Sequence, residues 1–96
     1  MWFEWDVNKN RTNKRKHGVS FELATLIFDD PHVVSELAES IEEERWLSIG
    51  LVNGVLILTV VHTWKERENE EIIRIISARK ATHKEVQEYQ NQFQKD

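Results

Sequence analysis

With 96 residues, 40% of them hydrophobic and four of them tryptophan, the chain is expected to fold as one packed domain, residues 1–96. It has no cysteine, which excludes disulfides and thiolate catalysis, and no signal peptide or long apolar run, so we expect a cytoplasmic protein without membrane contact. The net charge of −4 disfavours nonspecific nucleic-acid binding, but bases and acids are segregated along the chain, which favours a basic cleft on an acidic molecule.

The first part of the chain is predicted to form a short strand followed by a helix. The sequence WFEW at residues 2–5 is typical of a short strand. Asp6 then suits the N-cap of a helix that runs to about His17, because its carboxylate can accept a backbone N–H of the first turn. Gly18 follows as a residue that tolerates the left-handed conformation at a helix C-terminus.

A second helix is predicted over FELATLIF, residues 21–28. Ser20 is its N-cap, and Pro31 prevents the helix from continuing beyond the two preceding aspartates. The following segment, residues 32–43, combines the spacing of a helix with an extended start, and the sequence leaves its structure open.

The clearest local signal is a β-hairpin between residues 44 and 64. Two runs rich in strand-forming residues are joined by Asn53 and Gly54, which tolerate positive φ and favour a two-residue type I′ turn. Such a turn pairs Val52 with Val55 and sets every later pair, since register propagates from the turn. The pairs expected are Leu51 with Leu56, Ile49 with Leu58, Leu47 with Val60, and Arg45 with His62.

The two faces of this hairpin differ in character. One face is apolar and is expected to pack on helices as the core; it carries Leu47, Ile49, Leu51, Leu56, Leu58 and Val60. The opposite face has small or hydroxyl-bearing groups around one indole and suits a shallow ligand or partner surface. Its residues are Trp46, Ser48, Gly50, Thr59, Val61 and Thr63.

The C-terminal part is predicted to contain a third strand and a closing helix. A polar loop, residues 65–70, leads to a strand over about residues 72–78. Thr82 and Glu85 have the spacing of a capping box and open the last helix. The fold class expected is therefore α+β, with a small antiparallel sheet, two N-terminal helices and a C-terminal helix.

Basic residues near the last helix carry the chemical signal. Arg79 and Lys80 stand directly before its N-terminus, where positive charge is unfavourable unless an anion lies between them, and Arg74 in mid-strand also needs an anionic partner. No metal-binding histidine spacing, phosphate-binding glycine loop or nucleophile elbow is present, so no metal or cofactor is expected. Arginine, lysine and histidine on a small sheet supply the set that metal-free ribonuclease chemistry needs: a base for the ribose 2′-hydroxyl, cations for the phosphate and a proton donor. Composition and spacing alone are only a weak signal for this chemistry.

Several stretches, taken in order, resemble the sequences of a known family. They are FEWDVNKNRTNKRKHGVSFELATLIFDDP, EERW, IGLVNG, VVHTW and IRIISARKAT, and they extend from Phe3 to about Glu85. Together they resemble the BrnT family, the toxins of bacterial type II toxin–antitoxin modules. The resemblance implies a RelE-like fold, RNA cleavage that inhibits translation, and a BrnA-like antitoxin through which the complex represses its own operon.

The site expected from the chemistry and the resemblance combines cations with two histidines. The cations are expected to bind or neutralise the scissile phosphate, and the histidines are candidates for the acid or base, one of them supported by a further arginine. The cations are Arg74, Arg79 and Lys80, the histidines are His62 and His17, and Arg45 is expected to support His62.

The expected partners are an RNA substrate, a BrnA-like antitoxin in a hetero-oligomer, and operator DNA only through that antitoxin. Two other functions stay open. One is a weak or inactive family member that acts as an antitoxin-binding co-repressor, and the other is an RNA-binding module without turnover. Cleavage of RNA by purified protein in EDTA would distinguish the ribonuclease toxin from both of these alternatives.

Overall fold

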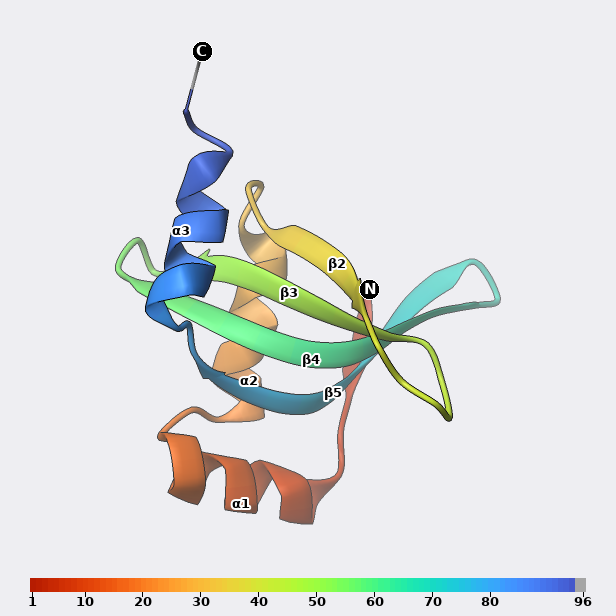
Figure 1. Ribbon diagram of the computed structural model, residues 1–96. Coiled ribbons are helices and arrows are strands. Elements are labelled where there is room, and N and C mark those ends of the chain that lie inside the picture. The colour runs from red at the N-terminus through yellow and green to blue at the C-terminus, as the bar shows by residue number, and fades with distance from the viewer. Residues whose placement is uncertain (95–96) are drawn as a thin grey trace.

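The computed structural model describes residues 1–94 and shows one five-stranded sheet with helices on both sides (Figure 1). The elements are β1 (Trp2–Glu4), α1 (Val7–His17), α2 (Phe21–Ala24), the 3₁₀ helix η1 (Thr25–Asp29), β2 (Val34–Ala38), β3 (Arg45–Val52), β4 (Leu56–Arg67), β5 (Glu70–Lys80) and α3 (His83–Asn91). The predicted α+β class is confirmed. The last two residues of the domain expected over residues 1–96 lie outside the described range. Within residues 1–94, no helix has the length and apolar character needed to span a membrane.

The strand order is β1-β5-β4-β3-β2, so β1 and β2 are the edges. Strands β2 to β5 pair antiparallel, but β1 runs parallel to β5, with Phe3 opposite Ile73. The sheet is therefore mixed, and the prediction of an antiparallel sheet is wrong at this edge. The pairing joins residues about 70 positions apart, which leaves no local pattern from which its direction can be read.

Helix α1 begins and ends at the predicted residues. Asp6 Oδ1 accepts a hydrogen bond from Lys9 N at 3.0 Å, and Gly18 has a φ of 71°. The helix lies along β5 beyond the end of β1 (Figure 1). There Asn13 Nδ2 donates to Ala78 O at 2.7 Å and Asn13 Oδ1 accepts from Ala78 N at 3.2 Å, which satisfies the backbone of β5 where no strand pairs with it.

The second predicted helix changes type part-way. Ser20 caps α2 as predicted, but after Ala24 the chain tightens into η1 and leaves the helical conformation before Pro31. Figure 1 shows this segment behind the sheet, and the main core lies between the two layers. The core residues are Val19, Phe21, Ala24, Ile27, Val52, Leu58, Val60, Ile73, Ile75 and Ala78.

The segment that the sequence left open, residues 32–43, contains β2 and most of a loop. Strand β2 pairs with β3, with Val34 opposite Ile49. Two adjacent β-branched residues, Val33 and Val34, favour the extended conformation at its start. Pairing with the apolar strand β3 outweighs the helical spacing of the segment. The loop, residues 39–44, then leads into β3.

The register of the central hairpin differs from the predicted one by a single residue. Val52 pairs with Leu56 rather than with Val55, because the turn contains three residues. Asn53 and Gly54 adopt the expected positive φ angles of 53° and 73°, and Val55 N donates to Val52 O at 3.2 Å. A shift of one residue turns each β3 side chain to the other face relative to β4.

Gly50 gives a physical reason for the observed register. A Cβ atom at this position would lie 2.7 Å from Ile27 Cβ, so η1 can approach β3 this closely only over glycine. Ser48 and Gly50 are therefore buried on the core face, whereas Ile49 pairs with Thr59 on the other face. The predicted division of the hairpin into one apolar and one polar face is wrong, because each face takes residues from both sets.

The second hairpin is tighter than predicted. The expected six-residue loop, residues 65–70, is mostly strand, with Arg67 opposite Glu70. Only Glu68 and Asn69 form the turn, at positive φ angles of 52° and 67°. Strands β4 and β5 therefore project beyond the rest of the sheet (Figure 1).

Helix α3 covers part of the front of the sheet in Figure 1. The predicted capping box is confirmed: Thr82 Oγ1 accepts from Glu85 N at 3.2 Å, and Glu85 Oε1 accepts from Thr82 N at 2.8 Å. Tyr89 OH donates to Asp30 Oδ2 at 2.6 Å, and the same oxygen accepts from Leu51 N at 2.8 Å. One buried carboxylate thus joins α3 to β3 and to the end of η1.

Candidate functional site

A β-bulge in β5 places two arginines on one face of the sheet. A regular strand would turn Arg74 and Arg79 to opposite faces, because they are five residues apart. Ile76, however, has no partner on β4, and this extra residue shifts the alternation. Arg74 is opposite Thr63 and Arg79 is opposite Thr59, two threonines that are four residues apart on β4 and so share a face. Both arginines lie on the face that carries α3.

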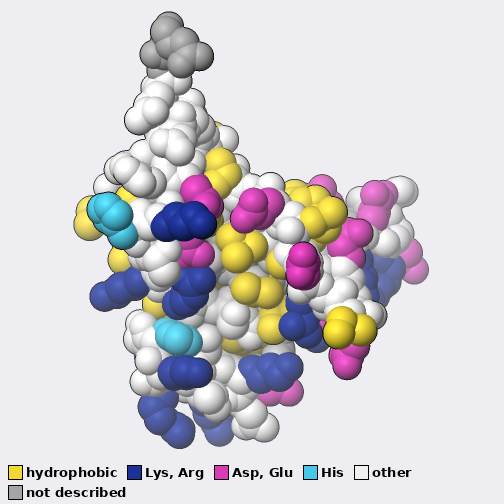
Figure 2. Space-filling model, in the orientation of Figure 1, with side chains coloured by type: hydrophobic (Ala, Val, Ile, Leu, Met, Phe, Trp, Pro, Cys, Tyr) yellow, Lys and Arg dark blue, Asp and Glu magenta, His cyan; other side chains and the backbone are white. Residues whose placement is uncertain are grey.

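Helix α1 adds basic side chains beside this strand. A crevice of about 350 Å³ lies between α1 and β5, and Lys9, Lys16 and His17 of the helix line it together with Ser77 of the strand. Figure 2 shows Lys and Arg side chains gathered on the lower part of this view, where Figure 1 places α1 and β5. We refer to this surface as the basic face. Its residues are Lys9, Lys16, His17, Arg74, Ser77 and Arg79.

Arg79 is held by a glutamate of the chain itself. Its Nη1 and Nη2 donate to Glu85 Oε1 and Oε2 at 2.6 and 2.9 Å. The same carboxylate accepts from Thr82 N at 2.8 Å and from Thr59 Oγ1 at 3.0 Å. These hydrogen bonds, that of Arg79 above all, lower the pKa of Glu85 to about 2. The anion expected beside Arg79 at this helix N-terminus is therefore an internal carboxylate.

A second carboxylate, Glu43, is shared by two arginines. Arg74 Nη2 donates to Glu43 Oε1 at 2.5 Å, and Arg45 Nη2 lies 3.6 Å from the same oxygen. The hydrogen bond from Arg74 is the main cause that lowers the pKa of Glu43. The predicted pairing of Arg45 with His62 is wrong, since Trp46 stands opposite His62 and Arg45 points to the other face.

His62 is fully buried on the face opposite the basic face. Its Nε2 is 2.7 Å from Ser48 Oγ, its Nδ1 is 3.0 Å from the Thr63 carbonyl oxygen, and its ring packs edge-on against Phe28. Because a carbonyl oxygen only accepts, Nδ1 donates to it and Nε2 accepts from the Ser48 hydroxyl. Burial lowers the pKa of His62, which favours the neutral ring.

The other predicted site residues have different surroundings. His17 is half-buried and lines the crevice beside Ser77. Lys80 is exposed and stands opposite Leu58, so its side chain leaves the sheet on the side opposite Arg79. The structure thus brings four of the six predicted residues to the basic face or beside it and places two elsewhere. The four are His17, Arg45, Arg74 and Arg79; the two are His62 and Lys80.

Sequence reasoning missed several members of this site. Ser77, Lys9 and Lys16 enter it only through the bulge and the position of α1, for which the sequence gives no direct signal. Glu85 was visible as half of a capping box, and that spacing placed a carboxylate near Arg79. Glu43 belongs to an acidic run without any feature that distinguishes it from its neighbours.

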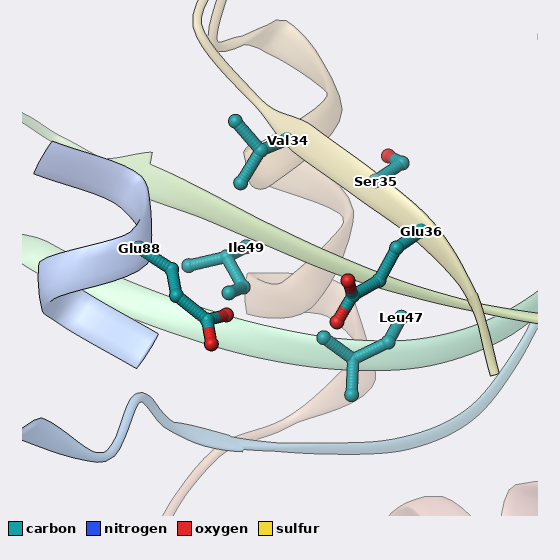
Figure 3. Close-up of a pocket in the computed structure, with 6 residues that line it drawn as sticks. All are labelled: Val34, Ser35, Glu36, Leu47, Ile49 and Glu88. Carbon is teal, nitrogen blue, oxygen red and sulfur yellow. The ribbon is translucent and has the colours of Figure 1, made fainter. Parts of the chain in front are cut away.

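A separate groove of about 200 Å³ lies between α3 and the strands β2 and β3. Val34, Leu47 and Ile49 give it an apolar lining. Figure 3 shows the carboxylates of Glu36, from β2, and Glu88, from α3, pointing toward one another across the groove. A surface with an apolar floor and two acidic walls suits the alkyl chain and cationic end of a lysine or arginine side chain.

The chemistry available on the basic face is that of anion binding with proton transfer. Guanidinium groups bind phosphate with directed pairs of N–H donors, and an accessible imidazole can take or give a proton near neutral pH. Among residues 1–94, no group of three or more His, Asp or Glu side chains is arranged to hold a metal ion.

Comparison with known proteins identifies the family of this chain. A family model described as "Ribonuclease toxin, BrnT, of type II toxin-antitoxin system" matches residues 5–85. No curated protein matches the chain. Among solved structures, the crystal structure of the Brucella abortus ribonuclease toxin BrnT is similar, with 27% sequence identity, a TM-score of 0.59, and coverage of 86% of this chain and 99% of that chain. In agreement with the resemblance predicted from its sequence, the chain belongs to the BrnT family of ribonuclease toxins of type II toxin–antitoxin systems.

Proposed function

We propose that this protein is an endoribonuclease toxin that cleaves RNA without a metal ion and uses the basic face as its active site. The observation that carries the proposal is the bulge at Ile76, which sets Arg74 on the same face as Ser77, where the crevice beside α1 holds His17. The family supports the reaction class, and the similar Brucella protein is itself described as a ribonuclease toxin.

The proposed reaction uses the substrate's own hydroxyl as the nucleophile. The 2′-oxygen of a ribose attacks the adjacent phosphorus, and the bond from phosphorus to the 5′-oxygen of the next nucleotide breaks. His17 accepts the proton of the 2′-hydroxyl, Arg74 stabilises the charge that builds on the phosphate, and Lys16 donates a proton to the leaving 5′-oxygen. The products are a 2′,3′-cyclic phosphate and a 5′-hydroxyl.

The two candidate histidines differ in access. His17 lines an open crevice, whereas His62 is fully buried with both ring nitrogens hydrogen-bonded. A direct role for His62 stays a prediction, and the geometry favours His17. Arg79 is occupied by Glu85 and acts in this proposal as the anchor of α3, while Lys80 leaves the sheet on the side opposite Arg79 and takes no part in binding the scissile phosphate.

The biological role proposed for the chain follows from its family. RNA cleavage in the cytoplasm inhibits translation, and a BrnA-like antitoxin neutralises the toxin in a hetero-oligomer that contacts operator DNA only through the antitoxin. The groove walled by Glu36 and Glu88 supports a basic segment of that antitoxin as the partner, because its charges are complementary. The RelE-like arrangement implied by the resemblance stays a prediction.

The decisive assay incubates purified protein with end-labelled RNA in EDTA and identifies the new ends. We expect fragments with 5′-hydroxyl ends and a loss of about 100-fold or more in rate for Arg74→Ala. Arg67→Ala, which removes an exposed arginine at the far end of β4, is the matched control and should cleave like the wild type. Folded wild-type protein that cuts no RNA, or cuts it only when a metal is added, would contradict the proposal.

The acidic groove also favours a second function, that of a catalytically weak antitoxin-binding co-repressor. This function predicts no cleavage in the EDTA assay together with tight, salt-sensitive binding of the antitoxin. A charge reversal, Glu88→Lys, should weaken that binding, and the same change should leave cleavage of free RNA unaltered if the first function is correct.

A further inference from the structure

Two arginines lie within ion-pair distance of the carboxylate of Glu43, and a lysine of the strand between them lies nearby. Arg74 of β5 and Arg45 of β3 lie 2.5 and 3.6 Å from its Oε1. Lys65 of β4, between these two strands, is close enough for its charge to lower the pKa of Glu43 further. Glu4, the β1 partner of Arg74, is exposed at the outer edge of this cluster. The centre of the cluster therefore carries more positive than negative charge.

The donors around this carboxylate are only partly used. Each guanidinium has five N–H donors, and both arginines direct a terminal nitrogen at one and the same oxygen. Arg45 Nε is buried and has no hydrogen-bond partner among residues 1–94. The two guanidinium groups converge on one carboxylate oxygen. A phosphodiester has two non-bridging oxygens, so it can accept hydrogen bonds from both guanidinium groups at once.

Glu43 is held weakly compared with the groups around it. It belongs to the loop of residues 39–44, whereas the three cations are on strands of the sheet. Among residues 1–94, its side chain accepts one hydrogen bond, that from Arg74. Ile41 in the same loop is completely exposed, so its side chain does not fasten the loop to the body of the molecule. A partly exposed ion pair with a single hydrogen bond contributes little to stability and can be exchanged at low cost.

We propose that Glu43 occupies a phosphate-binding subsite formed by Arg45, Lys65 and Arg74, and that a phosphodiester of the RNA displaces its carboxylate on binding. Glu43 is then an internal competitor that weakens RNA binding by the free toxin. The identity of the anion as RNA rests on the proposed function; the competition between carboxylate and phosphodiester is a property of the site itself.

The test measures the affinity of a short 2′-O-methyl RNA, which lacks the attacking hydroxyl and cannot be cleaved. Glu43→Gln should bind it about tenfold more tightly than the wild type, which corresponds to Glu43 filling the site about nine-tenths of the time. Glu44→Gln is the matched control: it removes the same charge from the same loop, and Glu44 takes part in none of the ion pairs among residues 1–94. It should change the affinity less than about twofold.

Two further measurements test whether the increase in RNA affinity arises at this subsite. Adding Arg45→Gln to Glu43→Gln should abolish the increase. In the wild-type protein, the NMR signal of Arg45 Nε–H should shift when the methylated RNA is added, and this readout does not depend on any variant folding. Equal affinity of Glu43→Gln and Glu44→Gln, or an unmoved Arg45 signal, overturns the proposal.

The outcomes also separate this proposal from the nuclease function. Tighter binding by Glu43→Gln in a protein that cuts no unmodified RNA would contradict the proposed activity and support the subsite. Cleavage of RNA together with equal RNA affinity of Glu43→Gln and Glu44→Gln would support the proposed activity and contradict the subsite.

Discussion

Strand β5 presents two arginines on one face, and each is paired with a glutamate in a different way. Glu85 accepts four hydrogen bonds, two from Arg79 and one each from Thr82 N and Thr59 Oγ1, and its side chain is 13% exposed. Glu43 accepts one, from Arg74, and is 24% exposed on a loop. The same pair of residue types is thus a fixed structural joint at one end of the strand and an exchangeable contact at the other.

The difference shows which arginine is available to a ligand. Displacing Glu85 from Arg79 would also break the capping box of α3 and a hydrogen bond to β4, so any incoming anion must compensate for all of these. Displacing Glu43 from Arg74 breaks one partly exposed ion pair. A basic residue therefore indicates an anion site only after its internal partners have been identified.

The largest expected effect concerns the histidine beside this strand. His17→Ala should reduce the rate of RNA cleavage by about 10²–10⁴-fold, the usual contribution of a positioned acid or base. His62→Asn should leave the rate per folded molecule within a few-fold, because His62 is on the buried face. Rates are measured on protein whose folded fraction is known from circular dichroism. A larger loss of cleavage rate in His62→Asn than in His17→Ala would contradict the assignment of catalysis to the basic face.

Replacing each of the two arginines by alanine tests whether they differ in role. Arg74→Ala should lower cleavage by about 100-fold or more and hardly change thermal stability, since it removes a phosphate contact. Arg79→Ala should mainly lower the melting temperature, because it removes the partner of Glu85. Cleavage rates and melting curves are recorded for both proteins. If the two variants lose activity and stability to the same extent, the distinction between the arginines is not real.

The two glutamates should also differ in their contribution to stability. Glu85→Ala is expected to cost about 2 kcal/mol, or roughly 10 °C in Tm, from the lost cap and an ion pair discounted for the exposure of Arg79. Glu43→Ala should move Tm by less than about 2 °C. Urea denaturation at pH 7 measures the first change and differential scanning calorimetry the second. Comparable losses in both would show that Glu43 is a structural joint as well.

The smallest expected effect is a dependence of stability on pH, to which His62 and Glu85 contribute in different pH ranges. Burial lowers the folded-state pKa of His62 below its ordinary 6.5, so the unfolded chain takes up a proton more readily and stability falls as the pH decreases below about 6.5. The contribution of Glu85, whose pKa is about 2, persists until the pH falls through 4.5 towards 2. Urea denaturation between pH 7 and 3 should show the first decline in the wild type and not in His62→Asn. A wild-type curve that stays flat between pH 6.5 and 5 would contradict the buried neutral imidazole.

Local chemistry made part of the fold predictable. The caps at Asp6, Ser20 and Thr82 and the positive-φ turn at Asn53 depend on neighbouring residues, and all four were found in the sequence. Register and bulges depend on contacts that the sequence does not display. A third turn residue, Val55, changed the register of the whole hairpin, and only the packing of η1 on β3 explains it.

The site was predictable by residue type but not by arrangement. Arg74 and Arg79 were recognised because cations in a strand and before a helix need anions, yet their partners Glu43 and Glu85 are set by tertiary contacts, the first of them 31 residues away. His62 follows the alternation of Leu58 and Val60 and so belongs to the buried face in the sequence as well; the register error of one residue changed only its partner, which is Trp46 and not Arg45.

Binding of RNA to the basic face can be observed in an NMR titration of ¹⁵N-labelled protein with 2′-O-methyl RNA. We expect the amide signals that shift most to include those of Lys16, His17, Arg74 and Ser77, while His62 and the core residues around it stay unchanged. Shifts confined to the opposite face, or to the groove beside Glu88, would contradict the account.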